Sequence, residues 1–285
     1  MVVSAKVLSL AGAATLLGGA AFAADLPPLP PSDYGPPVMV DPGVWYLRGY
    51  VGAGIQSFRS FDFTSTNTQS NIFFPPSWRV DQKSIKDTFL FGAGIGYQWN
   101  DWLRVDFTGD YRTDAKFKAV ASYFNGVNQA TDRFDGTHSA VVLLANVYLD
   151  LGTWWCLTPF VGVGLGGAFH RISPVTDLTL NTDGLGGTAF RFSEREHTQW
   201  NFTWALHAGA AYSITNNVKL EVAYRYLNMG NVQTAEVICG ASGCGSGLST
   251  RAFYSLMGLD SHDFMIGLRW MLQQELPPPP VIRKG

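Results

Sequence analysis

Apolar and polar side chains alternate strictly along residues 218–226. The apolar positions all fall on one face of an extended backbone, and the other face carries Lys219, Glu221 and Arg225. A period of two residues predicts a β-strand. In a soluble sandwich the apolar face of such a strand is buried. In a membrane barrel the apolar face meets lipid, and the charged face points into the lumen.

Seven further segments alternate in the same way, namely residues 45–58, 88–99, 102–112, 139–150, 157–170, 199–213 and 263–272. Soluble strands usually have about five or six residues. Strands of roughly ten to fourteen residues, as most of these are, can cross a bilayer when they are tilted. The pattern therefore predicts an all-β chain with about eight antiparallel strands.

The two faces of these segments differ in charge and in aromatic content. Asp, Glu, Lys and Arg are absent from the apolar faces. Trp and Tyr lie near the strand ends of those faces, as the interfacial girdles of a membrane barrel require: Trp45, Trp99, Tyr212 and Trp270. The opposite faces hold the charged side chains, which we expect to form a network in the lumen: Arg48, Arg104, Asp106, Asp110, Arg112, Asp150, Lys219, Glu221, Arg225 and Arg269.

The charges of this lumen network are of mixed sign, and such groups pair readily when they are close. The interior of an eight-stranded barrel is just wide enough for side chains to fill it. We therefore expect a salt-bridged, largely closed lumen. An acid–base role for Asp106 and Asp110 requires an accessible cleft, which a filled lumen does not provide.

The connections between the predicted strands alternate in length. Short links follow every second strand, at residues 100–101, 152–156 and 215–217. The other connections have roughly twenty-five to thirty-five residues and start near Arg59, Thr113, Arg171 and Met229. Short turns on one side and long loops on the other are typical of outer-membrane barrels. We therefore predict a closed antiparallel transmembrane β-barrel over residues 45–272, with its apolar face toward lipid.

Both ends of the chain lie outside the predicted barrel. Lys6 precedes a short apolar run and an Ala21-Phe22-Ala23 cleavage pattern, so residues 1–23 are interpreted as a secretory signal peptide. The run is too short for a transmembrane helix. Repeated Pro in residues 24–44 and 273–285 predicts two extended tails.

Composition supports this class of protein and excludes others. Charged residues make up 15% of the chain and aromatic residues 14%, and Gly occurs 31 times. The charged fraction is below that of an ordinary soluble domain. A net charge of -2 gives no reason to expect nucleic acid as a partner. The oligomeric state is left open.

Two further motifs have a possible chemical meaning. Gly162, Gly164 and Gly167 match a dinucleotide fingerprint, but no strand–turn–helix context follows them, so we expect no cofactor. These glycines are interpreted as leaving lumen space for large side chains. Cys239 and Cys244 lie close together in an oxidising compartment and are predicted to form a small disulfide loop. A metal site is the weaker alternative, because no His lies near them in that loop, and we expect no metal.

The order and spacing of several motifs resemble those of small alphaproteobacterial outer-membrane barrels. These motifs are AADL, WYLRGYVGAGI, TPFVGVGLGGAF, LEVAYRY and HDFMIGLRW. The similarity is to porin-family or surface-antigen barrels, which have the architecture of the OmpA-type transmembrane domain. It implies a location in the bacterial outer membrane, with membrane lipid and the barrel-assembly machinery as partners. Such barrels usually end on an aromatic residue, whereas this chain continues for thirteen residues after Leu272.

The resemblance also implies a role for the N-terminal tail. Several barrels of this kind expose an Ala-Asp N-terminus whose amine transpeptidases join to peptidoglycan, and Ala24-Asp25 matches that pattern. Attachment to peptidoglycan is therefore a hypothesis for this chain. The alternative is that Ala24-Asp25 is merely what signal cleavage leaves and that the tail is a passive spacer.

These features predict a non-enzymatic, structural and surface-exposed outer-membrane protein that supports envelope integrity. The first alternative is a narrow porin for small solutes. The second is a lipid-modifying enzyme, because Ser57 and His262 both have outward parity near the loop side, on strands that closure makes neighbours. Both residues lie at strand ends, where parity is a weak guide.

Overall fold

The computed structural model describes residues 43–65, 77–124, 129–181, 189–193, 195–239 and 252–272. Several predictions fall outside these residues. They are the signal peptide, the Ala24-Asp25 attachment point, Cys244 of the disulfide loop and the C-terminal tail. The structure describes the backbone of Cys239 but not its side chain.

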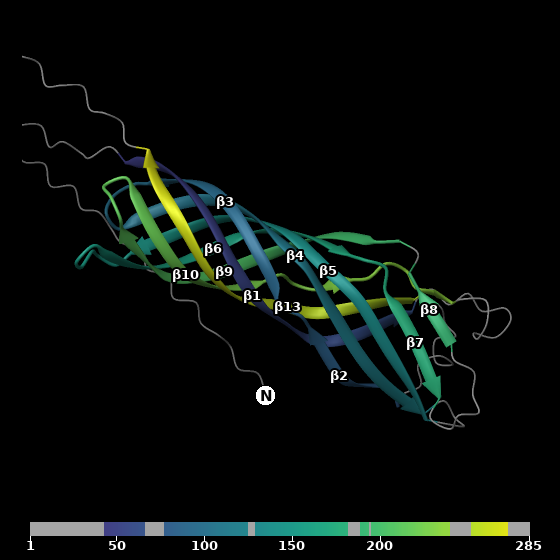
Figure 1. The fold of residues 1–285 in the computed structure, drawn as a ribbon. Helices are drawn as coiled ribbons and strands as arrows, with labels where there is room; N and C mark the ends of the chain where they lie inside the picture. Colours follow the sequence, from purple (N-terminus) through teal and green to yellow (C-terminus); the bar gives the residue numbers. More distant parts are fainter. Residues whose placement is uncertain are drawn as a thin grey trace, which may run out of the picture. The chain divides into compact units, whose positions relative to one another are not determined.

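Eight strands form a closed antiparallel ring (Figure 1). In ring order they are β1 (Val44–Ser65), β3 (Thr88–Gln98), β4 (Leu103–Phe124), β5 (Gln129–Asp150), β6 (Leu157–Ile172), β9 (His197–Ser213), β10 (Val218–Asn228) and β13 (Ala252–Leu272). Each strand is paired antiparallel with the next, and β13 pairs back with β1. Closure leaves no edge strand around the ring, which satisfies the backbone hydrogen bonds of a membrane-spanning sheet. The predicted closed β-barrel is confirmed.

Regular β-structure continues beyond the ring on the side of the long connections. There β1, β4, β5 and β13 run on and are joined by five short strands: β2 (Arg79–Ile85), β7 (Thr176–Asn181), β8 (Ala189–Phe192), β11 (Val232–Gln233) and β12 (Ile238–Cys239). We call this part the extension: residues 58–65 of β1, 115–124 of β4, 129–138 of β5, 252–259 of β13 and the five short strands.

The extension corrects the expectation of a long loop starting near Thr113. Residues on both sides of that point belong to a β-hairpin of β4 and β5, paired from Leu103↔Leu149 to Phe124↔Gln129. A β-bulge between Arg112 and Ala115 hides this pattern from the sequence. Residues with even numbers point inward up to Arg112, and after the bulge the inward residues are Ala115 and Phe117. One extra residue reverses the parity, so the alternation looks broken.

The apolar face of the ring points outward. Its large apolar side chains are exposed on every ring strand, including Trp45 at 54%, Phe89 at 73% and Trp270 at 57%. An exposed apolar band that surrounds a closed sheet is the surface that lipid covers. Tyr224 and Tyr226, in the alternating segment 218–226, lie on this outward face.

No helix long and apolar enough to span a membrane is found in the described part of the chain.

The interior contains two layers of different character. Inside the ring the largest fully buried side chains are Arg104, Arg112, Arg225 and Arg269. An apolar core fills most of the extension with Phe58, Phe61, Phe117, Phe134, Val232, Tyr254, Leu256 and Leu259, together with Val175 next to β7. The same core continues onto the ring strands through Leu227 of β10, Val142 and Leu144 of β5 and Ala168 of β6. The rings of Phe61, Phe134 and Tyr254 lie together, with centroids 4.7–5.5 Å apart. A largely apolar core, which also encloses the buried side chains of Asp132 and Asp177, thus lies directly beyond the charged interior.

Candidate functional site in the barrel interior

Glycines on the ring strands provide the space for the interior side chains. A Cβ atom added at Gly92 of β3 would lie 2.6 Å from Cζ of Tyr50 and 2.7 Å from Cβ of Asp110. A Cβ at Gly96 would meet the ring of Tyr46. On β6, a Cβ at Gly162 would meet Tyr148. These are contacts with lumen side chains, so the glycines act as spacers in strands.

The charged side chains nearest the extension form the upper cluster, which we define as Asp110, Arg112, Arg225 and Asp263. Arg225 lies between two carboxylates, with Nη1 2.8 Å from Asp110 Oδ2 and Nε 2.8 Å from Asp263 Oδ2. Arg112 makes a two-pronged contact with Asp263, with both N–O distances at 2.9 Å. Two cations and two anions therefore balance, in the bidentate geometry that suits Arg and carboxylate.

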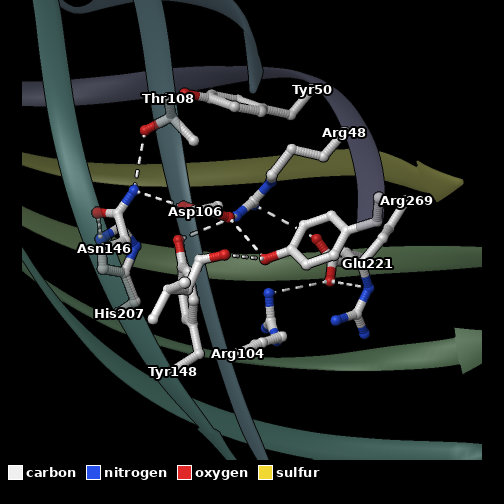
Figure 2. Close-up of polar contacts among 12 residues, drawn as sticks. Arg48, Tyr50, Arg104, Asp106, Thr108, Asn146, Tyr148, His207, Glu221 and Arg269 are labelled. Atoms are coloured by element: carbon white, nitrogen blue, oxygen red, sulfur yellow. Dashed lines mark hydrogen bonds and ion pairs between the residues drawn. The ribbon is translucent and has the colours of Figure 1, made fainter. Parts of the chain in front are cut away.

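The side chains nearer the short-turn end form the lower cluster, of which Figure 2 labels Arg48, Arg104, Asp106, Glu221 and Arg269. We define it as Arg48, Arg104, Asp106, Asp150, Lys219, Glu221 and Arg269. Arg48 joins two acids, with Nη1 2.9 Å from Asp106 Oδ2 and Nη2 3.3 Å from Glu221 Oε2. Arg104 Nε lies 3.0 Å from Asp150 Oδ1.

Glu221 is the common neighbour of three arginines in the lower cluster (Figure 2). Its Oε1 lies 3.8 Å from Arg104 Nη1 and 3.2 Å from Arg269 Nε. The Arg104 guanidinium also stacks over the Tyr148 ring, 4.0 Å from the centroid. Charges that are buried so deeply are stable only when they are paired and hydrogen-bonded.

Uncharged polar groups connect the clusters to the barrel wall. The Tyr46 and Tyr50 hydroxyls donate to Asp106 and Asp110 at 3.2 and 3.1 Å. Asn146 donates to Asp106 Oδ1 at 2.7 Å, and its own Oδ1 is 3.1 Å from Nε2 of His207. Asp106 and Asp110 therefore each contact an arginine and also accept a hydrogen bond from an uncharged donor.

All ten residues of the expected lumen network have inward parity, and nine of them are buried. Lys219 is the exception: it is half-buried at the short-turn mouth. Among the described residues, no ion pair joins Lys219 to a carboxylate.

Sequence reasoning missed Asp263, which binds both Arg112 and Arg225. Asp263 stands at the start of the segment 263–272 and shares the inward parity of Arg269. Parity alone was therefore a sufficient signal. Tyr46, Asn146 and His207 have inward parity as well, but parity does not show which side chains on other strands they contact.

A pair of histidines lies between the charged interior and the apolar core. Nε2 of His138 is 2.9 Å from Nδ1 of His170, and both side chains are buried. Two ring nitrogens are too few ligands for a usual zinc site. Within the described part of the chain, no group of three or more His, Cys, Asp or Glu side chains is placed to hold a metal ion.

Ser57 and His262 lie on paired strands, as ring closure requires. Ser57 is opposite Asp260, and His262 is opposite Ile55. His262 Nδ1 is 2.7 Å from the Tyr224 hydroxyl. In the described residues no hydrogen bond joins Ser57 to His262, so the contact between nucleophile and base that a hydrolase needs is not formed.

Cys156 ends the short link 152–156 and is exposed as a free thiol. Trp155 and Cys156 both have positive φ angles, of 50° and 71°.

Comparisons with known proteins match this architecture. The family described as "Outer membrane protein beta-barrel domain" matches residues 33–243. An uncharacterised protein of Brucella abortus is 32% identical over 203 residues, covering 66% of this chain and 69% of that protein. A candidate adhesin of Rickettsia prowazekii is 27% identical over 234 residues, covering 79% and 86%. Outer membrane protein PagN of Salmonella typhimurium is 25% identical over 240 residues, covering 79% and 88%.

Among solved structures, the outer membrane protein OprG of Pseudomonas aeruginosa is similar to this chain with a TM-score of 0.45 and 14% identity. The similarity covers 82% of this chain and 97% of OprG.

Proposed function

This chain belongs to the outer membrane protein β-barrel family, and we propose that it acts as a non-conducting, non-enzymatic scaffold that presents a surface outside the cell. The family places the protein in the bacterial outer membrane, with its apolar belt in lipid. In such barrels the short turns face the periplasm and the long connections face the exterior. The extension is therefore the part that stands above the membrane.

The observation that carries the proposal is the double closure of the interior. The charged clusters fill the ring, where Arg104, Arg112, Arg225 and Arg269 are each no more than 1% exposed. The apolar core of the extension closes the path above them. A solute would have to pass both a paired charge network and a packed, largely apolar core. This arrangement favours a structural barrel over a narrow porin.

The geometry gives little support to a catalytic role. Asp106 and Asp110 are both engaged with arginines inside the filled ring. His262 is engaged with Tyr224. The names of several relatives point to adhesion instead of catalysis, including the candidate adhesin of Rickettsia prowazekii.

The extension suits binding to an external surface, because its inward side chains are mostly apolar and many of its outward side chains are polar or charged. Most of its inward side chains form the apolar core, while outward residues such as Lys116, Lys118 and Arg133 are exposed. A rigid core holds the outward residues and the connecting segments in place above the lipid. Adhesion to an external surface is the use that such a platform fits best.

The test is attachment by intact cells of a host strain that lacks this protein. Cells that express the protein should bind a layer of cultured cells more than cells that carry an empty vector. The double variant Lys116→Glu/Lys118→Glu changes only outward charges of the extension and should lower attachment. As a matched control, Lys219→Gln changes a lysine at the opposite mouth and should not. Equal attachment by vector, wild-type and variant cells would reject the contact role.

A further inference from the structure

Five polar side chains stand together on the outward face of two neighbouring ring strands, β10 and β13. They are Tyr224, Tyr226, Asn228, Asp260 and His262, and we call them the rim cluster. Their positions are paired directly across the two strands, His262 with Tyr226 and Asp260 with Asn228. Charged side chains on the lipid face of a barrel are costly at the bilayer midplane and cost little near its surface. The height of the rim cluster therefore decides what it meets.

The rim cluster lies at the level of the lipid headgroups. Trp270 of β13 marks the aromatic girdle near the short turns. At about 3.4 Å per residue and a tilt of about 40°, β13 rises about 20 Å from Trp270 to His262 and about 26 Å to Asp260. The apolar band of an outer-membrane barrel is about 25 Å tall. The cluster thus faces the headgroups of the leaflet on the side of the extension.

Hydrogen bonds fix the geometry of the rim cluster. The Tyr226 hydroxyl and the Asn228 side-chain amide both donate to Asp260 Oδ1, at 2.9 and 2.6 Å. The Tyr224 hydroxyl lies 2.7 Å from His262 Nδ1. These contacts involve neither Asp260 Oδ2 nor His262 Nε2. The cluster therefore holds a carboxylate acceptor and a second ring nitrogen in place for an outside partner.

Aromatic rings extend the rim cluster sideways. The ring centroids of Tyr226 and His262 are 5.4 Å apart, and those of Tyr226 and Trp204 of β9 are also 5.4 Å apart. Three adjacent strands thus carry a row of rings beside the polar atoms of Asp260. Rings of this kind combine an apolar face with a polar edge. A sugar has the matching surface, because its C–H groups form an apolar face and its hydroxyl groups project from the edge.

An apolar groove of about 790 Å³ adjoins the rim cluster on the same wall. Its outward lining includes Val51, Phe89, Val222, Tyr224, Phe264 and Ile266. Tyr224 belongs to both the groove and the rim cluster. The groove lies within the belt that lipid covers, so an acyl chain is the occupant that its position and its apolar lining favour.

We propose that the rim cluster binds the sugar headgroup of a glycolipid whose acyl chain occupies the groove. Hydroxyl groups of the sugar donate to Asp260 Oδ2 and form a hydrogen bond with His262 Nε2, while its apolar face packs on the row of rings. The carboxylate of Asp260 repels a phosphate at this position, so the ligand contacts the cluster through its sugar and not through an anionic group. Because the cluster faces the membrane, this site does not depend on what the extension binds.

The test compares three lipids with the same acyl chains by native mass spectrometry of the full chain in detergent micelles. The lipids are glucosyl diacylglycerol, diacylglycerol and phosphatidic acid. The glucosyl lipid should bind at least about tenfold more tightly than diacylglycerol, because only its sugar supplies hydrogen bonds to the charged acceptor. Equal binding of the three lipids would reduce the groove to ordinary lipid contact and overturn the proposal. Tighter binding of phosphatidic acid would overturn it too.

A pair of variants assigns the preference to the rim cluster. The double variant Asp260→Ala/His262→Ala should lose the preference for glucosyl diacylglycerol over diacylglycerol. Asp114→Ala is the matched control, because Asp114 is an exposed acid of β4, which is not a neighbour of β10 or β13. It should bind the glucosyl lipid as wild type does. An unchanged preference in the double variant would contradict the assignment.

Photo-crosslinking of the wild-type protein locates the acyl chain without any substitution. A glucosyl diacylglycerol with a diazirine in its acyl chain should label peptides of β10 and β13 in preference to those of β5 and β6, on the other side of the ring. Labelling spread evenly over all ring strands would reject the groove as the place of the acyl chain.

Discussion

Arg225 illustrates how single residues hold the ring interior together. It is buried, and it contacts Asp110 at 2.8 Å and Asp263 at 2.8 Å. Taking charges out of water is costly, so such a pair adds little net stability compared with an apolar pair. Removing one partner is different, because it leaves an uncompensated charge in the interior.

Arg225→Ala should therefore destabilise the barrel by about 3–5 kcal/mol, since Asp110 loses its cation. Urea unfolding in lipid vesicles measures this difference. The control is Arg133→Ala, which breaks an exposed pair with Asp135 and should cost at most about 1 kcal/mol. Equal losses in the two variants would show that the interior pairs do not act as described.

Gly92→Ala tests the role of glycine as a spacer. The new methyl group would lie 2.6 Å from Tyr50 Cζ and 2.7 Å from Asp110 Cβ, so the lumen side chains must move. We expect a loss of about 1–3 kcal/mol from this overpacking. Gly49→Ala is the matched control, because nothing lies within 4 Å of its added Cβ. It should stay within about 0.5 kcal/mol of wild type by the same unfolding assay.

Parity in the sequence was enough to find which charged residues point inward, such as Arg48 and Glu221. It could not pair them. Arg112 of β4 reaches Asp263 of β13 across the interior, and these strands are not neighbours in the ring. Such contacts depend on side-chain reach across a closed barrel, and one sequence contains no measure of that.

At the scale of elements, the ring strands were predictable and the extension was not. The segments inside the membrane keep one parity, so the alternation of β10 or β6 is plain. In β4 the bulge after Arg112 reverses the parity, and the character of the inward face changes from charged to apolar. Two changes at one point make a single long strand look like a strand followed by a loop.

The bulge also marks the point where β4 changes its neighbouring strand. β4 pairs with β3 below the bulge and with β2 above it. Thr113, which lies in the bulge, accepts a hydrogen bond from the Phe89 N–H at 3.0 Å and another at its carbonyl from Thr88 at 2.7 Å. Thr113 thus provides a partner for the Phe89 N–H and receives one for its own carbonyl, at the point where β2 replaces β3 beside β4.

Phe134→Ala tests the apolar core of the extension. Phe134 is fully buried, with ring centroids 4.7 Å from Tyr254 and 5.1 Å from Phe61. Loss of the ring should leave a cavity and cost about 3–5 kcal/mol. Limited proteolysis in vesicles should then cut the extension faster while the ring stays protected.

Phe124→Ala is the control for that experiment, because Phe124 is 45% exposed at the end of β4. Its proteolysis should match wild type. If Phe134→Ala is cut no faster than Phe124→Ala, the extension does not depend on this core.

At the scale of the whole molecule, closure of the ring leaves every ring strand paired on both sides. Opening such a barrel requires many hydrogen bonds to break together, so unfolding should be slow. Unheated protein in SDS should migrate differently from boiled protein and show a strand-dominated circular dichroism spectrum. Identical migration together with a helical spectrum would disprove a stable closed barrel.

The N-terminal tail leads to a separate prediction about the cell wall. The start of β1 and the end of β13 lie at the same end of the ring, where Trp45 is paired with Leu272. In barrels of this kind that end, the end of the short turns, faces the periplasm. In polyproline form, at about 3 Å per residue, roughly twenty tail residues could reach about 60 Å. If Ala24 is joined to peptidoglycan, muramidase-digested sacculi should yield an N-terminal peptide that carries a muropeptide mass. Free amines on every recovered N-terminus would leave the tail as a passive spacer.

Single-channel recording of the pure protein in planar bilayers tests the central claim most directly. The charged clusters and the largely apolar core of the extension lie in series, so we expect no open path for ions. We predict a current close to that of the empty bilayer, with small and rare openings at most. Steady, large conductance would contradict the sealed interior and identify the protein as a porin.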